Sequence, residues 1–286
     1  MLNLSNQITY KRVFAELFLT KIGFTKLSAT GNDFILIDNR QKIMFGNEYD
    51  LIRKICSRRT GIGADGVLLI EESVENDFKM RYYNADGFEA EMCGNGARAC
   101  AYYSDKNGIA RSQMTFEVSG AHYSAHVDGA FISLLMQKPE NLNLHPAALE
   151  STDFQEGGYL VLGVPHYVLF ADRIQEIDVE KVGSYYCEHP EFKPRKTNVN
   201  FVSQQNGKIQ IRTFERGVNE ETLSCGTGTV SSAIILNMVR KKTYPMDFET
   251  AGGPLRVDFD VTSGRYLLQG TVTEVYTGSF QMENFS

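Results

Sequence analysis

Hydrophobic and polar residues alternate along much of this chain, which is the pattern expected of half-buried β-strands. The alternation covers the segments FILID, FKMRYY, YVLF and IQIRTF. Two alternating runs flank Asp128-Gly129 within residues 116–136, and a hairpin is expected around Asn206-Gly207, because these pairs accept the backbone angles of a tight turn. The patterns predict antiparallel meanders.

Two segments instead have helical periodicity, and each follows the pattern Cys-Gly-x-Gly. The first, GARACAYYSDK, stops at Asn107-Gly108, which is a common C-terminal signal. The second, TVSSAIILNMVRKK, has basic residues near its end, where the helix dipole favours them. Apolar residues cover so much of the second helix that we expect a sheet to enclose it. They are Val230, Ile234, Ile235, Met238 and Val239.

The two halves of the chain repeat each other at one fixed offset. Cys93 and Cys225 are 132 positions apart, and each half has the same predicted order of strands, Cys-Gly-x-Gly, helix and strand pair. The same offset relates Gly31 to Gly163, Gly96 to Gly228, Ala101 to Ala233, Phe116-Glu117 to Phe248-Glu249, and Gly120 to Gly252. The sequence therefore predicts an internal duplication and an α+β fold of two like domains.

Length and charge narrow the class of protein. The 286 residues suit two domains, and 42% hydrophobic with 22% charged residues is typical of a folded globular protein. A net charge of -6 argues against a nucleic-acid surface, so we expect a small-molecule partner. Residues 1–21 have neither the apolar length of a membrane span nor a signal-peptide cleavage site. We expect them to be an extension.

The five cysteines are odd in number and include no C-x-x-C pair, so neither a disulfide framework nor a zinc site is indicated. This use of cysteine is typical of the reducing cytoplasm. His122 and His126 have the spacing of helical zinc ligands, but they lie in an alternating strand segment, so no metal site is expected. Three cysteines are expected to be buried as small apolar residues: Cys56, Cys100 and Cys187.

Cys93 and Cys225 call for a different interpretation because they share one position of the repeat. A pseudo-two-fold axis would bring the two helix N-termini to opposite walls of one cleft. The N–H groups of a helix N-terminus bind a carboxylate and lower the pKa of a thiol. One thiolate can then remove an α-proton while the other thiol delivers a proton to the opposite face. We therefore expect a racemase or epimerase without a cofactor.

The stretch GIGADG matches the dinucleotide-binding pattern G-x-G-x-x-G. Its surroundings are wrong for an oxidoreductase, because LIRKICSRR before it is predicted as a helix and VLLIEE after it as a strand. A binding module without catalysis would not need two thiols.

Three segments, FTKLSATGNDFILID, NADGFEAEMCGNGARACA and FERGVNEETLSCGTGT, together resemble the diaminopimelate epimerase family, and the resemblance extends from Phe24 onward. It implies interconversion of LL- and meso-2,6-diaminopimelate in lysine and peptidoglycan biosynthesis, with no cofactor or metal. It also implies two β-barrel-like antiparallel sheets, each around a central helix, with the active site in the cleft between them. The expected domains are 1–137 plus 271–286, and 138–270. A homodimer through Tyr276 is expected.

The resemblance makes Cys93 and Cys225 the acid and base, with His166 and Glu215 tuning their protonation. The substrate would contact Asn32, Asn84, Gly94, Asn95, Asn198, Glu215, Arg216, Gly226 and Thr227. Two positions depart from the family pattern and bear on the distal end of the substrate. Val164 replaces a common asparagine, and Gly66 replaces a common glutamine.

A proline or hydroxyproline racemase of the same fold is the alternative function. Those enzymes typically have histidine where this chain has Asn95, and proline where it has Ser224.

Overall fold

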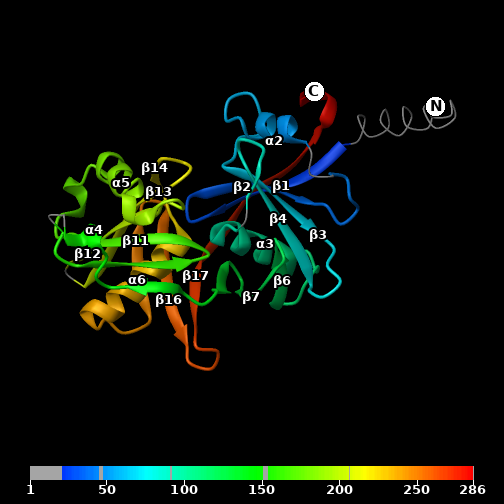
Figure 1. Cartoon of the computed structure of the whole chain (residues 1–286). Coiled ribbons are helices and arrows are strands. Elements are labelled where there is room, and N and C mark those ends of the chain that lie inside the picture. The colour runs from blue at the N-terminus through cyan, green and yellow to red at the C-terminus, as the bar shows by residue number, and fades with distance from the viewer. Residues whose placement is uncertain (1–20, 45–47, 91, 151–153, 206, 286) are drawn as a thin grey trace, which may run out of the picture.

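The computed structural model describes residues 21–44, 48–90, 92–150, 154–205 and 207–285. Two lobes lie side by side, and each holds one helix against a curved set of strands (Figure 1). All described strands belong to one hydrogen-bonded sheet, in which antiparallel pairings predominate. The predicted α+β class is confirmed. Of the predicted extension, residues 1–20 lie outside the described residues, and Lys21 opens the first strand.

The N-terminal half contains, in chain order, β1 (Lys21–Ala29), β2 (Asn32–Asp38), α2 (Tyr49–Cys56), β3 (Gly66–Glu71), β4 (Phe78–Asn84), β5 (Glu89–Ala90), α3 (Gly94–Lys106), β6 (Gln113–Val118), β7 (Ala121–Asp128) and β8 (Phe131–Leu135). The C-terminal half contains β9 (Glu140–Asn143), α4 (Ala147–Glu150), β10 (Gly157–Leu162), β11 (Val164–Phe170), η1 (Ile174–Glu176), α5 (Val179–Cys187), η2 (Pro190–Phe192), β12 (Asn198–Gln205), β13 (Lys208–Glu215), β14 (Glu220–Thr222), α6 (Gly226–Arg240), β15 (Met246–Thr250) and β16 (Gly253–Asp260). The last elements are β17 (Arg265–Gln281) and η3 (Met282–Phe285).

The duplication is visible in the pairing of the strands. In the N-terminal half β2 and β3 run parallel, with Phe34 opposite Gly66. In the C-terminal half β11 and β12 also run parallel, with His166 opposite Asn198. Both residues of the second pair lie 132 positions after those of the first. The two central helices, α3 and α6, begin at the same offset, so the predicted duplication is confirmed.

The strand predictions need one correction. Residues 116–136 were expected to form two alternating runs, but a turn at Ser119-Gly120 divides them among β6, β7 and β8. Both turn residues have positive φ angles, of 49° and 80°, and alternation alone does not mark such a turn. The predicted hairpin joins β12 to β13 at Gly207, while Asn206 lies outside the described residues.

Helix α6 is buried over most of its length, as expected. Val230, Ile234 and Ile235 are fully or almost fully buried. Met238, which was expected on the same apolar face, is 39% exposed, so that part of the prediction is wrong. The helix ends at Arg240, and Met238 and Arg240 in its last turn are exposed.

One hydrophobic core runs through both halves. It includes Ala97 of α3 and Val230 of α6, and it continues through Leu268 of β17. Two smaller clusters lie on the outer faces, one beneath α2 around Ile52 and one beneath α5 around Tyr186. Packing thus joins the two repeats into one body.

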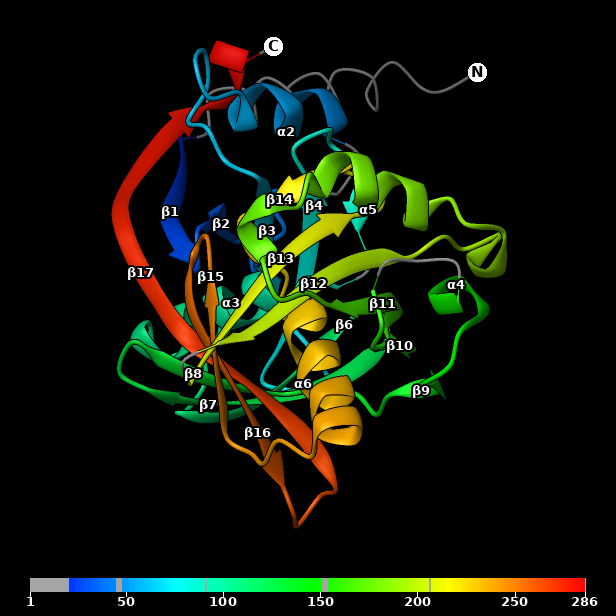
Figure 2. The same ribbon diagram turned by 90° about the vertical axis from the view of Figure 1, so that its left-hand side faces the viewer.

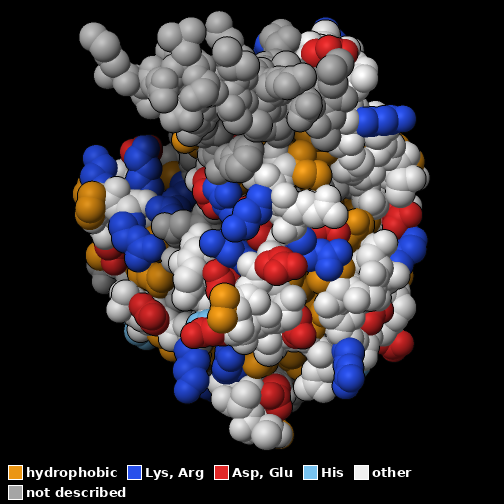
Figure 3. All heavy atoms as spheres, turned by 90° about the vertical axis from the view of Figure 1, so that its right-hand side faces the viewer, with side chains coloured by type: hydrophobic (Ala, Val, Ile, Leu, Met, Phe, Trp, Pro, Cys, Tyr) orange, Lys and Arg blue, Asp and Glu red, His pale blue; other side chains and the backbone are white. Residues whose placement is uncertain are grey.

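Strand β17 connects the halves (Figure 2). Its first residues pair with β16 and β8, and from Val272 onward it pairs with β1. The domain limits of 137/138 and 270/271 stay a prediction. Figure 3 shows one face of the molecule, on which charges of both signs are interspersed. Among the described residues, no helix has both the length and the apolar character needed to span a membrane.

Candidate active site

Cys93 and Cys225 are the N-cap residues of α3 and α6. Both have extended backbone angles, with φ and ψ of -127° and 115° at Cys93 and of -117° and 109° at Cys225. At this position the side chain lies beside the unpaired N–H groups of the first helical turn. The Cys93 sulfur accepts the N–H of Gly96 at 3.4 Å. The two cysteines therefore stand where the repeat predicted them.

The starts of the two helices meet. The Asn95 amide of α3 donates to both the carbonyl and the hydroxyl oxygen of Ser224, each at 3.3 Å, directly before Cys225. A methyl group on Gly226 would lie 2.7 Å from the side chain of Leu268, and one on Gly94 would lie 3.2 Å from it. A side chain at position 226 would therefore force the Leu268 side chain to shift.

The thiol of Cys93 is partly buried and contacts Asn32. It donates to the amide oxygen of Asn32 at 3.6 Å. Burial raises the pKa of the Cys93 thiol to about 11, and the N–H groups of Gly96 and Asn95 offset only part of this rise. The sequence predicted a lowered thiol pKa from the helix N-terminus alone. That prediction is wrong for the free enzyme, because desolvation outweighs the donors.

Cys225 has a carboxyl group as its neighbour. Burial raises the pKa of the Cys225 thiol well above its usual value, and the nearby charge of Glu215 adds to this rise. Thr222 donates to Glu215 at 2.7 Å. Burial also raises the pKa of the Glu215 carboxyl, while hydrogen bonds from Thr222 and Cys225 oppose the rise. Glu215 is therefore well suited to accept the proton of the Cys225 thiol.

His166 is fully buried on β11, beside Asn200 of β12. The Asn200 amide nitrogen lies 3.3 Å from Nδ1 of His166 and 3.2 Å from the carbonyl of Tyr167. The Asn200 oxygen accepts from Thr213, so the nitrogen is the group that faces the ring. Nδ1 of His166 must then accept, which places the ring proton on Nε2. That N–H is buried and has no acceptor within the described residues.

The charge state of His166 follows from its surroundings. Burial, followed by the positive charge of Arg216, lowers its pKa to about 3. The ring is neutral at physiological pH and offers Nε2–H as a donor.

Arg98 is a charged group that the sequence analysis missed. Its guanidinium is fully buried on α3 and donates through Nη2 to Thr30 and to the Asn95 oxygen, both at 2.9 Å. Nε and Nη1 have no acceptor among the described residues. Burial lowers the pKa of Arg98 to about 10. The available signal was a basic residue within a helix of small and apolar residues, GNGARACA.

The remaining candidates lie at matching strand ends of the repeat. Asn32 and Val164 are related by the 132-residue offset, as are Gly66 and Asn198, and Asn84 and Arg216. Gly66 pairs with Asn84 across β3 and β4, and the Asn198 amide oxygen accepts the backbone N–H of Arg216 at 2.9 Å. Asn84 is exposed, and the Arg216 guanidinium donates to the carbonyl of Arg195. The predicted binding residues thus come to corresponding ends of the two repeats.

The two departures from the family pattern have different structural settings. A side chain at Gly66 would place its Cβ 2.3 Å from the carbonyl oxygen of Tyr83 and 2.6 Å from the ring of Tyr82. The backbone of Tyr83, together with the ring of Tyr82, therefore excludes a glutamine at position 66 unless β4 moves. Val164 is partly buried at the start of β11, opposite Leu162. It supplies no polar group.

Other expectations can be placed as well. Cys56, Cys100 and Cys187 are buried, as predicted. His122 and His126 lie on β7 with exposed side chains, and no group of three or more potential metal-ligating side chains occurs in the described part of the chain. The segment GIGADG follows α2 and precedes β3, the reverse of the dinucleotide-binding order. Sequence reasoning used that segment to reject a nucleotide site and to note Gly66, but it missed Asp65, which contacts Asn32 at 2.6 Å.

Comparison with known proteins decides the family. The sequence model of the family described as "Diaminopimelate epimerase" matches residues 24–138 and 158–282. The chain belongs to the diaminopimelate epimerase family. A diaminopimelate epimerase from Flavobacterium psychrophilum is 39% identical over 238 residues, which cover 82% of this chain and 90% of that protein. A diaminopimelate epimerase from Hydrogenobaculum sp. is 36% identical over 279 residues, covering 91% and 99%.

Solved structures support the fold. A phenazine biosynthesis protein of the PhzF family from Bacillus anthracis matches with a TM-score of 0.69 and 16% identity, over 91% of this chain and 99% of that chain. A probable proline racemase from Agrobacterium radiobacter matches with a TM-score of 0.61 and 14% identity, over 90% and 92%. At identities of 14–16% this likeness concerns the fold alone. Proteins named for other functions therefore have the same fold as this chain.

Proposed function

We propose that this protein is an isomerase that interconverts LL- and meso-2,6-diaminopimelate by moving a proton at one α-carbon. One observation carries the proposal. In a member of the diaminopimelate epimerase family, two free cysteines cap the two helices whose N-termini are joined by the Asn95–Ser224 contact. Two thiols at the junction of two repeats provide one proton-transfer group for each face of a carbon.

The reaction uses the two thiols in turn. Glu215 takes the proton of the Cys225 thiol, and the resulting thiolate removes the α-proton of the substrate. The Cys93 thiol then delivers its proton to the opposite face, so the substrate loses one proton and gains one. The N–H groups of Gly94, Asn95, Gly226 and Thr227 hold the α-carboxylate, because helix N-termini favour an anion. They also stabilise the negative charge that develops when the proton leaves.

The distal end of the substrate is only recognised. Its carboxylate and ammonium groups suit a set of amides and a guanidinium, which we assign to Asn84, Asn198 and Arg216. The Nε2–H of His166, which has no partner among the described residues, adds a buried donor near Arg216. The positive charge of Arg216 lowers the pKa of His166.

A chiral assay tests the proposal. Purified protein would be incubated in parallel with LL-diaminopimelate and with L-proline, and the stereoisomers would be separated by chromatography. We expect meso-diaminopimelate to form and proline to stay unchanged. Racemisation of proline alone would replace the proposed function by the proline racemase alternative. Asn95 and Ser224 argue against that alternative, because they stand where those enzymes typically have histidine and proline.

The metabolic setting and the assembly are part of the proposal. The reaction belongs to lysine and peptidoglycan biosynthesis, and a chemistry that needs two reduced thiols suits the cytoplasm. We propose a homodimer through β17, where Val275 is 54% exposed and Tyr276 44% exposed. Apolar side chains adjacent on one strand supply the kind of surface that a second copy of the chain covers.

A further inference from the structure

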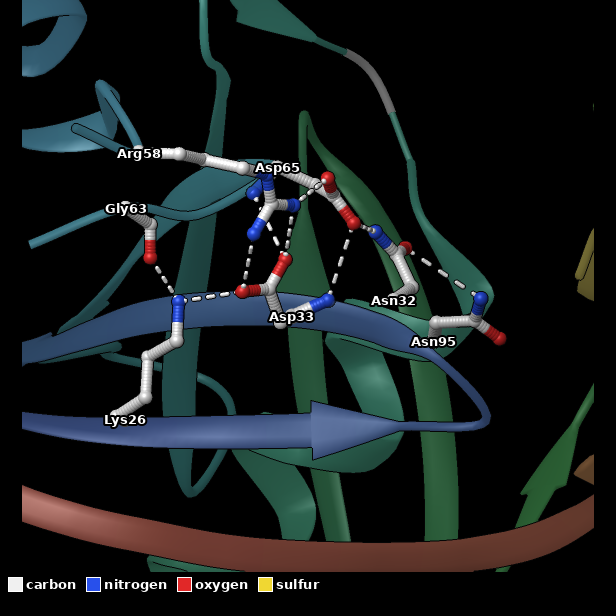
Figure 4. Close-up of polar contacts among 7 residues, drawn as sticks. All are labelled: Lys26, Asn32, Asp33, Arg58, Gly63, Asp65 and Asn95. Carbon is white, nitrogen blue, oxygen red and sulfur yellow. Dashed lines mark hydrogen bonds and ion pairs between the residues drawn. The ribbon is translucent and has the colours of Figure 1, made fainter. Parts of the chain in front are cut away.

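A network of charged side chains lies next to Asn32, on the side away from Asn95 (Figure 4). Arg58 donates to both carboxylate oxygens of Asp33, at 2.8 and 3.1 Å, and to Asp65 at 2.6 Å. Lys26, only 8% exposed in its side chain, forms an ion pair with Asp33 at 2.6 Å and donates to the carbonyl of Gly63. The two carboxylates are therefore held in place by two cations.

Asp65 extends this network to Asn32. Its Oδ2 accepts the side-chain N–H of Asn32 at 2.6 Å and the backbone N–H of Asp33 at 3.1 Å. Its backbone N–H in turn donates to the carbonyl of Asp33 at 3.0 Å. The carboxylate of Asp65 is thus fixed on both sides, by Arg58 and by the backbone of β2.

A carboxylate decides which way a neighbouring amide turns. The two ends of a carboxamide have almost the same size, so hydrogen bonding alone sets their order. The Asp65 carboxylate can only accept, and so the nitrogen of Asn32 must face it. The oxygen of Asn32 then faces the opposite side, where it accepts from the Cys93 thiol at 3.6 Å and from the Asn95 amide at 3.4 Å.

We propose that Asp65 is a positioning residue for the reaction: it turns the Asn32 amide so that an oxygen faces the Cys93 thiol and favours the S–H form of that thiol in the free enzyme. An amide oxygen stabilises S–H as a donor, whereas an amide N–H would stabilise the thiolate. Cys93 then rests as the proton donor. The role of Cys93 as proton donor rests on the proposed function. The effect of Asp65 on the protonation of the Cys93 thiol in the free enzyme does not.

Other groups also face Cys93, and they do not replace this contact. Glu215 of β13 favours the thiol through its charge, while Arg98 and the N–H groups of Gly96 and Asn95 favour the thiolate. Two further titratable groups, Tyr82 of β4 and Cys100 of α3, also sense the charge of Cys93. Among these groups, Asn32 is the one whose effect on the Cys93 thiol depends on its orientation. Its oxygen favours the thiol, whereas its nitrogen would favour the thiolate.

The second half of the repeat has no pair equivalent to Asn32 and Asp65. The positions that correspond to Asn32 and Asp65 at the 132-residue offset are Val164 and Thr197. Cys225 has the Glu215 carboxyl as its neighbour instead. A change at Asp65 should therefore alter one thiol and leave the other unchanged, which provides an internal reference.

The test measures alkylation of the two thiols without substrate. The full chain would be treated with iodoacetamide between pH 6 and pH 10, and the rates at Cys93 and Cys225 would be followed separately by mass spectrometry. In Asp65→Asn the amide of Asn32 loses its acceptor-only partner and can turn its nitrogen toward the sulfur, giving up the hydrogen bond from Asn95. We expect Cys93 to be alkylated about tenfold faster at pH 8, as for a downward pKa shift of about one unit, with Cys225 unchanged within about twofold.

Two control variants separate orientation from charge. Asp65→Glu keeps an acceptor-only group and should restore slow alkylation of Cys93. Asp33→Asn removes a negative charge from the same network without touching the Asn32 side chain, and it should leave both rates near those of the unmodified chain. Circular dichroism would establish folding, and Asp65→Ser takes the place of Asp65→Asn if the latter does not fold.

The proposal is overturned by any of three results: an unchanged rate at Cys93 in the folded Asp65→Asn or Asp65→Ser variant, an equal acceleration in Asp33→Asn, or an equal acceleration at Cys225. None of these results depends on epimerase activity. Failure of the proposed function would appear instead in the chiral assay of the unmodified chain.

Discussion

Cys93 and Cys225 occupy the same position of a repeat but have chemically different partners. Cys93 donates to an amide, Asn32, whereas Cys225 lies beside a carboxyl group, Glu215, that can take its proton. Duplication therefore kept a cysteine at the start of both helices while the surroundings of the two thiols diverged. Under the proposed function, each thiol is the base in one direction and the acid in the other, and the different partners decide which thiol more readily gives up its proton in the free enzyme.

Replacing either cysteine by alanine should abolish inversion but leave one proton-transfer group. We expect inversion in Cys93→Ala and in Cys225→Ala to fall at least about a thousandfold, because a positioned acid or base is lost. In deuterated water each variant should retain slow α-proton exchange with a different stereoisomer. Chiral chromatography and mass spectrometry would measure the two processes. Inversion near the unmodified rate in either folded variant would rule out the two-thiol mechanism.

Burial of neutral His166 should make stability depend on pH. The unfolded chain binds a proton to this ring below about pH 6.5, but the folded chain does so only near pH 3. Stability is therefore fully present above pH 6.5 and is lost as the pH falls toward 3. The loss amounts to about 1.4 kcal/mol of unfolding free energy for each pH unit within that window.

Urea unfolding at pH 6.5 and pH 4.5 would check this expectation. His166→Gln should be less stable at both values but should lose about 2 kcal/mol less between them. His126→Gln, which changes an exposed histidine on β7, serves as the control and should keep the slope of the unmodified chain. Asp33, whose pKa is lowered to about 2 despite burial, chiefly by its hydrogen bond from Arg58, loses its contribution only at more acidic pH. An unchanged slope in His166→Gln would contradict the assignment.

The sequence predicted the catalytic candidates because they recur at a fixed offset and match a family pattern. It did not predict Arg98 or Asp65 as parts of the site. Arg98 becomes notable only when its burial is known, and Asp65 only when the chain brings it to Asn32 across 33 positions. The raised thiol pKa of Cys93 was missed for the same reason, since desolvation is a property of the folded chain.

Two turns from different halves pack backbone against backbone. A Cβ on Gly252, between β15 and β16, would lie 2.1 Å from the carbonyl oxygen of Thr30, between β1 and β2. Gly252 also donates to the carbonyl of Leu223, close to Cys225. This contact holds the loop before Asn32 against the loop before Cys225.

Gly252→Ala should therefore lower stability and activity together. The added methyl cannot be accommodated without moving one turn, and overpacking of this kind costs about 1–3 kcal/mol. Gly23→Ala on β1 is the matched control, because a Cβ there meets nothing within 4 Å. Urea unfolding and the chiral assay would be applied to both variants. Equal stability of the two variants would show that the turns move apart at little cost.

At the level of elements, prediction succeeded where the signal is local. The ends of α3, the start of α6 and the hairpin of β12 and β13 follow from cysteine, asparagine and glycine at particular positions. The sequence patterns did not predict the parallel pairing of strands that are distant in sequence, such as β4 with β6 and β13 with β15. Periodicity reveals which face of a strand is buried but does not reveal its neighbour.

The exposed part of β17 provides a test of the proposed homodimer. Tyr276 packs edge-on against Phe24 of β1 while 44% of its surface stays exposed. We expect light scattering to give the mass of a dimer for the unmodified chain and of a monomer for Tyr276→Glu, because a charge would be buried unpaired at the interface. Tyr185→Glu on α5, where the tyrosine is 60% exposed, should leave the dimer intact. A monomeric unmodified chain would end the proposal of a dimer.

For the molecule as a whole, the sequence predicted two like halves but not how completely they merge. The 132-residue offset reveals the duplication, yet the core runs through both halves and includes Leu268. Leu268 also packs where α3 and α6 begin. The junction depends on contacts that have no counterpart within one repeat, and a repeat pattern therefore does not predict them.

Strand β17 also constrains how the chain can fold as the ribosome makes it. It is the last of the described strands to be synthesised, and it pairs with β1, β8 and β16. Until it emerges, each of those three strands has one edge without this partner, and unpaired edges favour association with other chains. The nascent halves are therefore both incomplete, and a single strand closes them once it has emerged. Chaperones that shield strand edges would be needed most during that interval.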